Sequence, residues 1–302
     1  MEIKEFNYDM LDDLKYNPSI VLASQRGGGK SFLLNSLMKK LCSLKLHGHK
    51  GYSHIMAFSQ TDKFTGQMDN FVPKDYIFDS LEPLQKIIDT RKNSKIPIEE
   101  RKNICLIFND IANLRENNSY DRNTKSIKNS SSLEYLFSLG RHNLRATIIV
   151  LVQSLVMLSP LARINSDITF FWTAKNALVR KKIKEEYLGL ASKKEAEQLY
   201  NDVFDGTPYQ CFVVNSWMQG TTKLNQFVFK FLAPEKTKKW SSKFVKEYKK
   251  IKKAKDKNKV IPNKKNNIFT IYNDETKTNR IQTKTYKTRS KTKRKVGKLS
   301  AD

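Results

Sequence analysis

Short apolar segments alternate with amphipathic segments along the first 235 residues of the chain. Five segments are rich in β-branched and aromatic residues and mostly apolar on both faces, which is typical of strands in a parallel sheet covered by helices on each side. These predicted strands are Ser19–Ala23, His54–Phe58, Ile104–Phe108, Thr147–Val152 and Ile168–Trp172. Helical periodicity is found in the segments Lys30–Leu46, Leu81–Arg91, Leu133–His142 and Lys175–Tyr187. The alternation predicts an α/β fold with right-handed crossovers.

Two further apolar segments and one polar segment complete the predicted domain. Gln210–Val214 and Lys223–Phe231 are predicted strands that extend the sheet or form an antiparallel edge. Arg115–Ser132 is mostly polar and is predicted to be a long loop, a kind of insertion that is often functional or disordered in compact domains. We therefore expect one folded domain over residues 1–235.

Positive charge is concentrated after this domain. Residues 236–302 hold 24 basic and 5 acidic residues, so +19 of the net charge of +26 lies there. Such a cluster of cations favours nonspecific contact with nucleic-acid phosphates, because binding releases condensed counterions. Solubility or a nuclear targeting signal is the alternative interpretation of the same charge.

The basic region divides into a predicted helix and a predicted tail. Residues 236–255 carry apolar side chains at helical spacing, which predicts an amphipathic helix that docks on the domain and exposes a cationic face. Residues 256–302 have few large apolar side chains, a composition typical of a disordered, Lys-rich tail. The predicted anchors of the helix are Trp240, Phe244, Tyr248 and Ile251.

The cysteines and the apolar segments both favour an intracellular location. Cys42, Cys105 and Cys211 are isolated and lack the spacing of metal ligands, so we expect reduced, buried thiols. No apolar stretch reaches the roughly 18 residues that a transmembrane helix needs. The first residues include Glu2 and lack the apolar region of a secretory signal.

The segment from Ser24 to Ser31 has the composition of a phosphate-binding loop. An apolar predicted strand runs into Ser24, three glycines precede Lys30 and Ser31, and an amphipathic helix follows at once. Glycines let backbone N–H groups face phosphates, the lysine reaches the β and γ phosphates, and the serine hydroxyl binds Mg²⁺. Ser24 stands where the usual motif begins with glycine. The predicted nucleotide-binding residues are Ser24, Gln25, Arg26, Gly27, Gly28, Gly29, Lys30, Ser31 and Phe32.

Two later predicted strands end in polar side chains suited to the same chemistry. The segment NICLIFND ends in Asn109 and Asp110, and a carboxylate there can hold Mg²⁺ or polarise the attacking water. The segment TIIVLVQS ends in Gln153, whose amide can sense the γ-phosphate or orient water. The segments that end in Asp110 and Gln153 are weak signals by themselves, but their order after the glycine-rich segment supports the interpretation of both.

Four segments together resemble a known superfamily. ASQRGGGKS, ICLIFND, LGRHNLRATIIVLVQS and SPLARINSDITFFW look like the FtsK-HerA superfamily of DNA-translocating ATPases, particularly the genome packaging ATPases of poxvirus-like large DNA viruses and their virophages. The resemblance covers about residues 15–235 and leaves the basic tail unexplained.

The resemblance implies a RecA-like P-loop ATPase core that binds ATP and Mg²⁺. It also implies assembly into a homo-oligomeric ring, commonly a hexamer, that moves double-stranded DNA, here into a preformed capsid in the host cytoplasm or a viral factory. Lys30 and Asp110 would be catalytic and Gln153 the sensor, with Ser31, Asp110 and Asn109 at the metal. Arg141 and Arg163 are the two candidates for an arginine finger that reaches a neighbour's nucleotide.

One departure from the superfamily pattern keeps other functions open. Its members usually carry two acidic residues after the second strand, whereas this chain has Asn109 before Asp110. Hydrolysis would then rest on one carboxylate, or the ATPase would be weakened. A noncatalytic, capsid-associated protein that binds nucleotide and DNA is the alternative that Asn109 keeps open. A P-loop kinase or a GTPase-like enzyme is a further alternative, although the sequence has neither a guanine-reading motif nor an acceptor lid.

Overall fold

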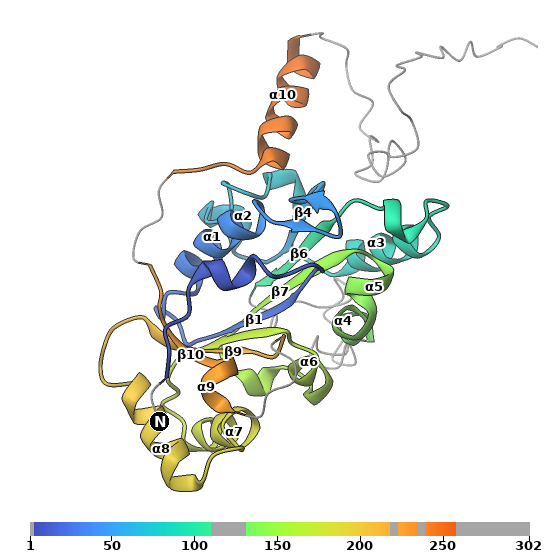
Figure 1. The fold of residues 1–302 in the computed structure, drawn as a ribbon. Coiled ribbons are helices and arrows are strands. Elements are labelled where there is room, and N and C mark those ends of the chain that lie inside the picture. The colour runs from blue at the N-terminus through green and yellow to red at the C-terminus, as the bar shows by residue number, and fades with distance from the viewer. Residues whose placement is uncertain (1–2, 110–130, 218–222, 235–238, 258–302) are drawn as a thin grey trace, which may run out of the picture. The chain divides into compact units, whose positions relative to one another are not determined.

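A mainly parallel sheet forms the centre of the fold in the computed structural model, which describes residues 3–109, 131–217, 223–234 and 239–257 (Figure 1). Its eight strands lie in the order β10-β9-β8-β1-β7-β6-β4-β5. The strands are β1 Ser19–Ala23, β4 His54–Phe58, β5 Ile77–Phe78, β6 Ile104–Asn109, β7 Ala146–Val152, β8 Ile168–Phe171, β9 Gln210–Asn215 and β10 Val228–Leu232. Neighbours from β8 to β5 are parallel, and β9 is antiparallel to both β8 and β10. The predicted α/β fold and its antiparallel edge are confirmed.

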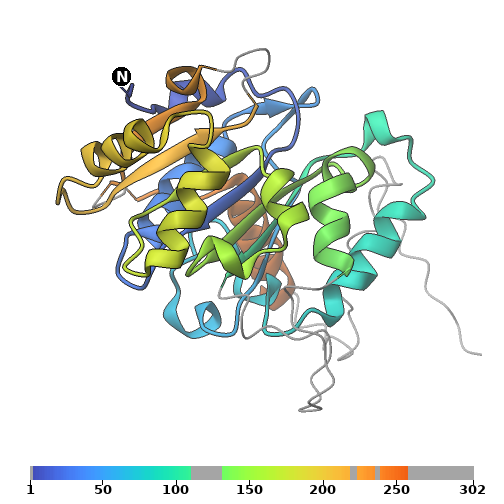
Figure 2. The ribbon, with the colours of Figure 1, turned by 90° about the horizontal axis from the view of Figure 1, so that it is seen from below.

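Helices cover both faces of this sheet (Figures 1 and 2). Helix α1 lies on one face, and α6 and α7 lie on the other, as the view from below shows (Figure 2). The helices are α1 Lys30–Leu41, α2 Asp62–Thr65, α3 Glu82–Lys92, α4 Ser131–Tyr135, α5 Arg141–Asn143, α6 Pro160–Ile164, α7 Ala177–Tyr187, α8 Lys193–Val203, α9 Leu224–Phe227 and α10 Lys243–Lys257. A π-helical turn, Leu136–Gly140, joins α4 to α5, so the predicted helix Leu133–His142 is helical throughout.

The central strands are buried on both faces, as their apolar sequences predict. Every residue of β1, β4, β7 and β8 is buried, and β6 is buried up to its last residue. The rings of Phe58 and Phe108 stack across β4 and β6 with their centroids 4.9 Å apart. Removing this apolar surface from water is the main stabilising contribution to the sheet.

The first predicted helix ends earlier than expected. We expected helix to Leu46, but α1 stops at Leu41 and a hairpin of β2 (Lys45–Leu46) and β3 (His49–Lys50) follows. The two turn residues have positive φ angles, 47° at His47 and 81° at Gly48. Two successive positive φ angles fit a two-residue hairpin turn and are incompatible with a continuing helix.

The last predicted strand of the domain starts later than expected. Lys223–Phe231 was predicted as one strand, whereas Leu224–Phe227 forms the helical turn α9 and β10 begins at Val228. Leu224 is buried beneath this turn, so the apolar pattern reports its burial rather than a strand. Of the predicted loop Arg115–Ser132, only its last two residues are described, and they begin α4.

The basic helix is present, and three of its four predicted anchors pack on the domain. In α10, Phe244 lies 5.3 Å from the ring of His54, and the hydroxyl of Tyr248 donates to Asp75. Trp240 precedes the helix and donates its indole N–H to Asn35 Oδ1 on α1. Ile251 was predicted to dock, but it is 56% exposed, so this predicted anchor is wrong.

Burial also sets the ionisation of side chains under α10. Burial, with help from the cations Arg91 and Lys102, lowers the pKa of His54 to about 4, so this imidazole is neutral at physiological pH.

The chain divides into two units, residues 1–260 and 261–302. The second unit, and with it nearly all of the predicted tail, lies outside the described residues. Within the described residues, no helix is long and apolar enough to cross a membrane.

Candidate nucleotide-binding site

The loop between β1 and α1 requires its three glycines for two different reasons. Gly27 and Gly29 have φ angles of 78° and 96°, a conformation that residues with a side chain rarely adopt. At Gly28, an added Cβ would lie 1.8 Å from Ser24 Oγ, so the loop has no room for it. Ser24 itself is buried and donates its hydroxyl to the carbonyl of Gln25, 3.0 Å away. The serine in the first motif position is therefore accommodated by the glycine opposite it.

The start of α1 is suited to an anion. Gly29 is the N-cap residue and supplies no side-chain hydrogen bond to the first turn, which contains no acidic residue. The N–H groups at the start of a helix lack intrahelical partners, and the helix dipole makes them electropositive. Ser31 and Phe32 are exposed in this turn. Together with the glycine loop, the turn forms a cradle that a nucleotide phosphate fits.

Lys30 lies over the same loop. Its ammonium donates to the carbonyl oxygen of Gln25 at 3.1 Å and to that of Ser24. Gln25 and Arg26 are exposed at the tip of the loop. The lysine thus holds a positive charge beside the loop backbone, where a phosphate would bind. A bound anion would replace the contacts of the ammonium with the two carbonyl oxygens.

The strand register brings the other predicted residues to this edge of the sheet. Ala23 of β1 pairs with Val152 of β7, and Leu151 of β7 pairs with Asn109 of β6. Ser24 N–H continues the ladder by donating to Val152 O at 3.0 Å. Gln153, the next residue, is exposed beside the loop. The structure therefore brings together the glycine loop, Gln153 and Asn109, while Asp110 lies outside the described residues.

A carboxylate that the sequence motifs did not single out lies next to Asn109. Asp62 begins α2, four residues after β4 ends, and is 2% exposed. Its Oδ2 accepts the side-chain N–H of Asn109 at 2.6 Å. The sequence signal is the polar segment that follows the predicted strand His54–Phe58, although Asp62 lies four residues beyond its strand, whereas Asn109 ends β6 and Gln153 directly follows β7.

The donor set fits Mg²⁺ bound together with a nucleotide. The described residues contain no group of three His, Cys, Asp or Glu side chains that could hold a metal alone. Mg²⁺ usually binds through one or two protein oxygens, with phosphate and water completing its shell. The Ser31 hydroxyl and the Asn109 amide oxygen are protein oxygens of this kind at the nucleotide edge.

Neither candidate arginine lies in the nucleotide site of its own chain. Arg141 Nη1 lies 2.6 Å from Asp167 Oδ1, and Asp167 also accepts the N–H of Ser19, the first residue of β1. This places Arg141 at the amino ends of the strands, the edge opposite the glycine loop. Arg163 is buried on α6, with its Nε 2.8 Å from Glu186 Oε2 on α7. A finger role for either arginine remains a prediction that concerns a neighbouring subunit.

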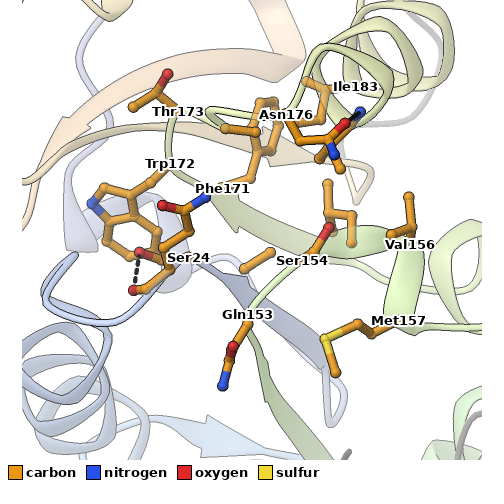
Figure 3. Close-up of a pocket in the computed structure, with 15 residues that line it drawn as sticks. Ser24, Gln153, Ser154, Val156, Met157, Phe171, Trp172, Thr173, Asn176 and Ile183 are labelled. Carbon is orange, nitrogen blue, oxygen red and sulfur yellow. Dashed lines mark hydrogen bonds between the residues drawn. The ribbon is translucent and has the colours of Figure 1, made fainter.

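A pocket of about 330 Å³ opens beside the loop. Ser24 and Trp172 bound it on one side and Val156 and Met157 on the other, with Asn176, the N-cap residue of α7, above them (Figure 3). The Gln153 amide points away from Trp172 and Asn176 in this view (Figure 3). The pocket therefore adjoins the phosphate cradle but lies on the α7 side of the sheet.

Comparison with known proteins finds similarity among solved structures only. No protein-family profile and no curated protein matches the sequence. The genome packaging NTPase B204 from Sulfolobus turreted icosahedral virus 2, in complex with ATP-gammaS, is 15% identical, with a TM-score of 0.45 over 71% of this chain and 96% of that one. The pCW3 conjugation coupling protein TcpA is 16% identical, with a TM-score of 0.49 over 73% and 61%.

A third solved structure is of EssC, ATPases 2 and 3, from Geobacillus thermodenitrificans. It is 11% identical, with a TM-score of 0.42 over 81% of this chain and 45% of that one. The three solved structures are thus of a genome packaging NTPase, a conjugation coupling protein and a pair of ATPases. Similarity at this level assigns no activity to this chain.

Replacing Gly28 with alanine tests whether the loop binds nucleotide. The added methyl group overlaps Ser24 Oγ and lies 3.1 Å from Ser24 Cβ and 3.3 Å from Gln25 O, so the hydroxyl must rotate and the loop must adjust. We expect affinity for ATP to fall at least about tenfold, the equivalent of roughly 1.4 kcal/mol. Gly140→Ala is the matched control, because a Cβ there meets only ordinary contacts at 3.6–3.7 Å. Equilibrium binding of a fluorescent ATP analogue measures both. Unchanged affinity in Gly28→Ala would place the nucleotide elsewhere.

Proposed function

We propose that this chain is an ATP-hydrolysing motor that moves double-stranded DNA and packages a viral genome into a preformed capsid. The observation that carries the proposal is the convergence, at one edge of a parallel sheet, of a three-glycine loop, a helix start, Lys30 and the polar ends of β6 and β7. Such a convergence binds a nucleoside triphosphate and leaves side chains beside its terminal phosphate.

Each residue of the edge has a role in this proposal. The loop N–H groups and Lys30 hold the β and γ phosphates and stabilise the negative charge that develops on them. Ser31 and Asn109 offer oxygens to Mg²⁺, which neutralises phosphate charge when it is bound. Gln153 orients the attacking water through its amide, and Asp110 accepts the proton of that water or polarises it.

The DNA-binding part of the proposal rests on charge. The lysines of α10 between residues 243 and 253 are exposed and form a cationic surface, although one of them, Lys252, also lies 3.8 Å from Asp75 of the domain. Trp240 connects the base of this helix to Asn35 on α1, the helix that starts at the phosphate cradle. The cationic residues of α10 are Lys243, Lys246, Lys249, Lys250, Lys252 and Lys253.

The proposed assembly is a homo-oligomeric ring, in which a neighbour completes each nucleotide site. Arg141 and Arg163 lie away from the nucleotide edge of their own chain, so either would act as a finger only across a subunit contact. Arg141 is the better placed of the two, because its side chain is partly exposed whereas Arg163 is buried. The proposed location is the host cytoplasm or a viral factory, with the capsid as partner.

ATP turnover with and without long double-stranded DNA tests the catalytic part of the proposal. We expect DNA to stimulate turnover and Lys30→Ala to reduce it at least about 100-fold, because the variant loses a cation that stabilises the transferring phosphate. Asp110→Asn should lower turnover similarly while still binding ATP. Lys39→Ala, which removes an exposed lysine near the other end of α1, should change turnover less than about twofold.

Binding of ATP without hydrolysis, with or without DNA, would contradict the motor. It would favour the alternative of a noncatalytic protein that binds nucleotide and DNA. Phosphate transfer to a small acceptor would instead favour a kinase.

Salt dependence tests whether α10 contacts DNA. Replacing Lys246, Lys249, Lys250 and Lys253 by alanine should reduce the slope of log affinity against log salt by up to about 0.9 for each DNA phosphate that the variant no longer neutralises. The matched control removes four exposed lysines elsewhere, Lys175, Lys181, Lys193 and Lys194. Fluorescence anisotropy with labelled duplex DNA measures the slopes. Equal slopes for both quadruple variants would show that the lysines of α10 contribute no more to DNA binding than lysines elsewhere on the surface.

A further inference from the structure

Two neutral side chains of the described residues donate hydrogen bonds to the carboxylate of Asp62, which is buried. Its backbone N–H donates to Ser59 Oγ at 3.2 Å, which fixes the start of α2 after β4. Thr65 Oγ1 donates to Oδ1 at 3.2 Å, and Asn109 Nδ2 donates to Oδ2 at 2.6 Å. Burying a carboxylate is unfavourable unless its surroundings compensate, so a group held in this way calls for a functional explanation.

The contact determines which way the Asn109 amide faces. A carboxylate only accepts hydrogen bonds, so the NH₂ group of Asn109 must be the side that faces Asp62. The amide oxygen then lies on the other side of Cγ. Strand β6 pairs with β4 on one side and with β7 on the other. With its NH₂ group directed to the β4 side, Asn109 offers its oxygen away from Asp62, at the edge that carries Gln153 and the glycine loop.

We propose that Asp62 is a positioning residue of the nucleotide site, which orients the Asn109 oxygen toward nucleotide-bound Mg²⁺. This inference rests on the proposed function, because it requires that the glycine loop binds a metal-bound nucleotide. The pair also replaces, in two residues, what a carboxylate at position 109 would supply: Asn109 provides the oxygen and Asp62 provides the negative charge behind it. Outer partners of this kind orient metal ligands and strengthen them as donors.

The isosteric variant Asp62→Asn separates positioning from packing. An asparagine at position 62 fills the same space and can still accept the Asn109 N–H, so the fold retains its hydrogen bond. The substitution removes the negative charge. Because an amide at position 62 can also donate a hydrogen bond, Asn109 can then turn its side-chain oxygen toward position 62. A purely structural role for Asp62 would tolerate this change, whereas a positioning role would not.

The experiment measures the affinity of the full-length protein for a fluorescent, nonhydrolysable ATP analogue with excess Mg²⁺ and with EDTA. The readout is the ratio of the two affinities, which reports the metal and not the rate of turnover. We expect Asp62→Asn to reduce this ratio about tenfold, in line with other outer-partner substitutions, and to leave the affinity in EDTA within about twofold. Tyr52→Phe is the matched control, because it removes one buried side-chain hydrogen bond, to Thr147 Oγ1 at 3.0 Å, at the opposite edge of the sheet.

The reversed pair provides the rescue. Asp62→Asn/Asn109→Asp restores one carboxylate and one amide in contact, with the charge now at the strand end, and we expect its ratio to return to the wild-type value or exceed it. A wild-type ratio in Asp62→Asn, or equal losses of affinity with and without metal, would overturn the inference alone. A wild-type protein that binds no nucleotide under either condition would overturn the proposed function as well.

Discussion

The in-register alignment of four parallel strands is the constraint on which the proposed site depends. Because Ala23, Val152, Phe108 and Phe58 fall at nearly the same height in the sheet, the chain leaves β1, β7, β6 and β4 at one edge. Burial of both faces holds this register, since a slip of one residue would place side chains on the wrong face. The glycine loop, Gln153, Asn109 and Asp62 are therefore neighbours although they are far apart in sequence.

The opposite edge of the sheet shows how the alignment is locked. Asn17 Nδ2 donates to Asn103 Oδ1 at 3.1 Å, and Tyr52 donates to Thr147 Oγ1 at 3.0 Å, all of them buried at the amino ends of the strands. Satisfied buried polar contacts of this kind specify one arrangement, because any shift would leave a group without a partner. The edge at the amino ends of the strands thus fixes the strand register, and the edge that carries the glycine loop presents polar groups to a ligand.

The sequence predicted most of the sheet because its strands are apolar on both faces, and it predicted the glycine loop because position and composition agree there. It did not predict the hairpin after α1, since His47 adopts a positive φ that composition does not reveal. It also missed Asp62, whose importance depends on the pairing of β4 with β6, a contact across 47 residues. The roles of Lys30, Gln153, Arg141 and Arg163 remain predictions, and Asp110 lies outside the described residues.

Displacement of a triplex-forming oligonucleotide from long duplex DNA tests the central claim most directly, because only movement along the duplex removes the third strand. The account predicts displacement that requires hydrolysable ATP and Mg²⁺, starts after a delay that grows with the distance between the loading end and the triplex, and is absent in Lys30→Ala. ATP hydrolysis by the wild-type protein with no displacement at any distance would contradict the claim that this chain is a DNA motor.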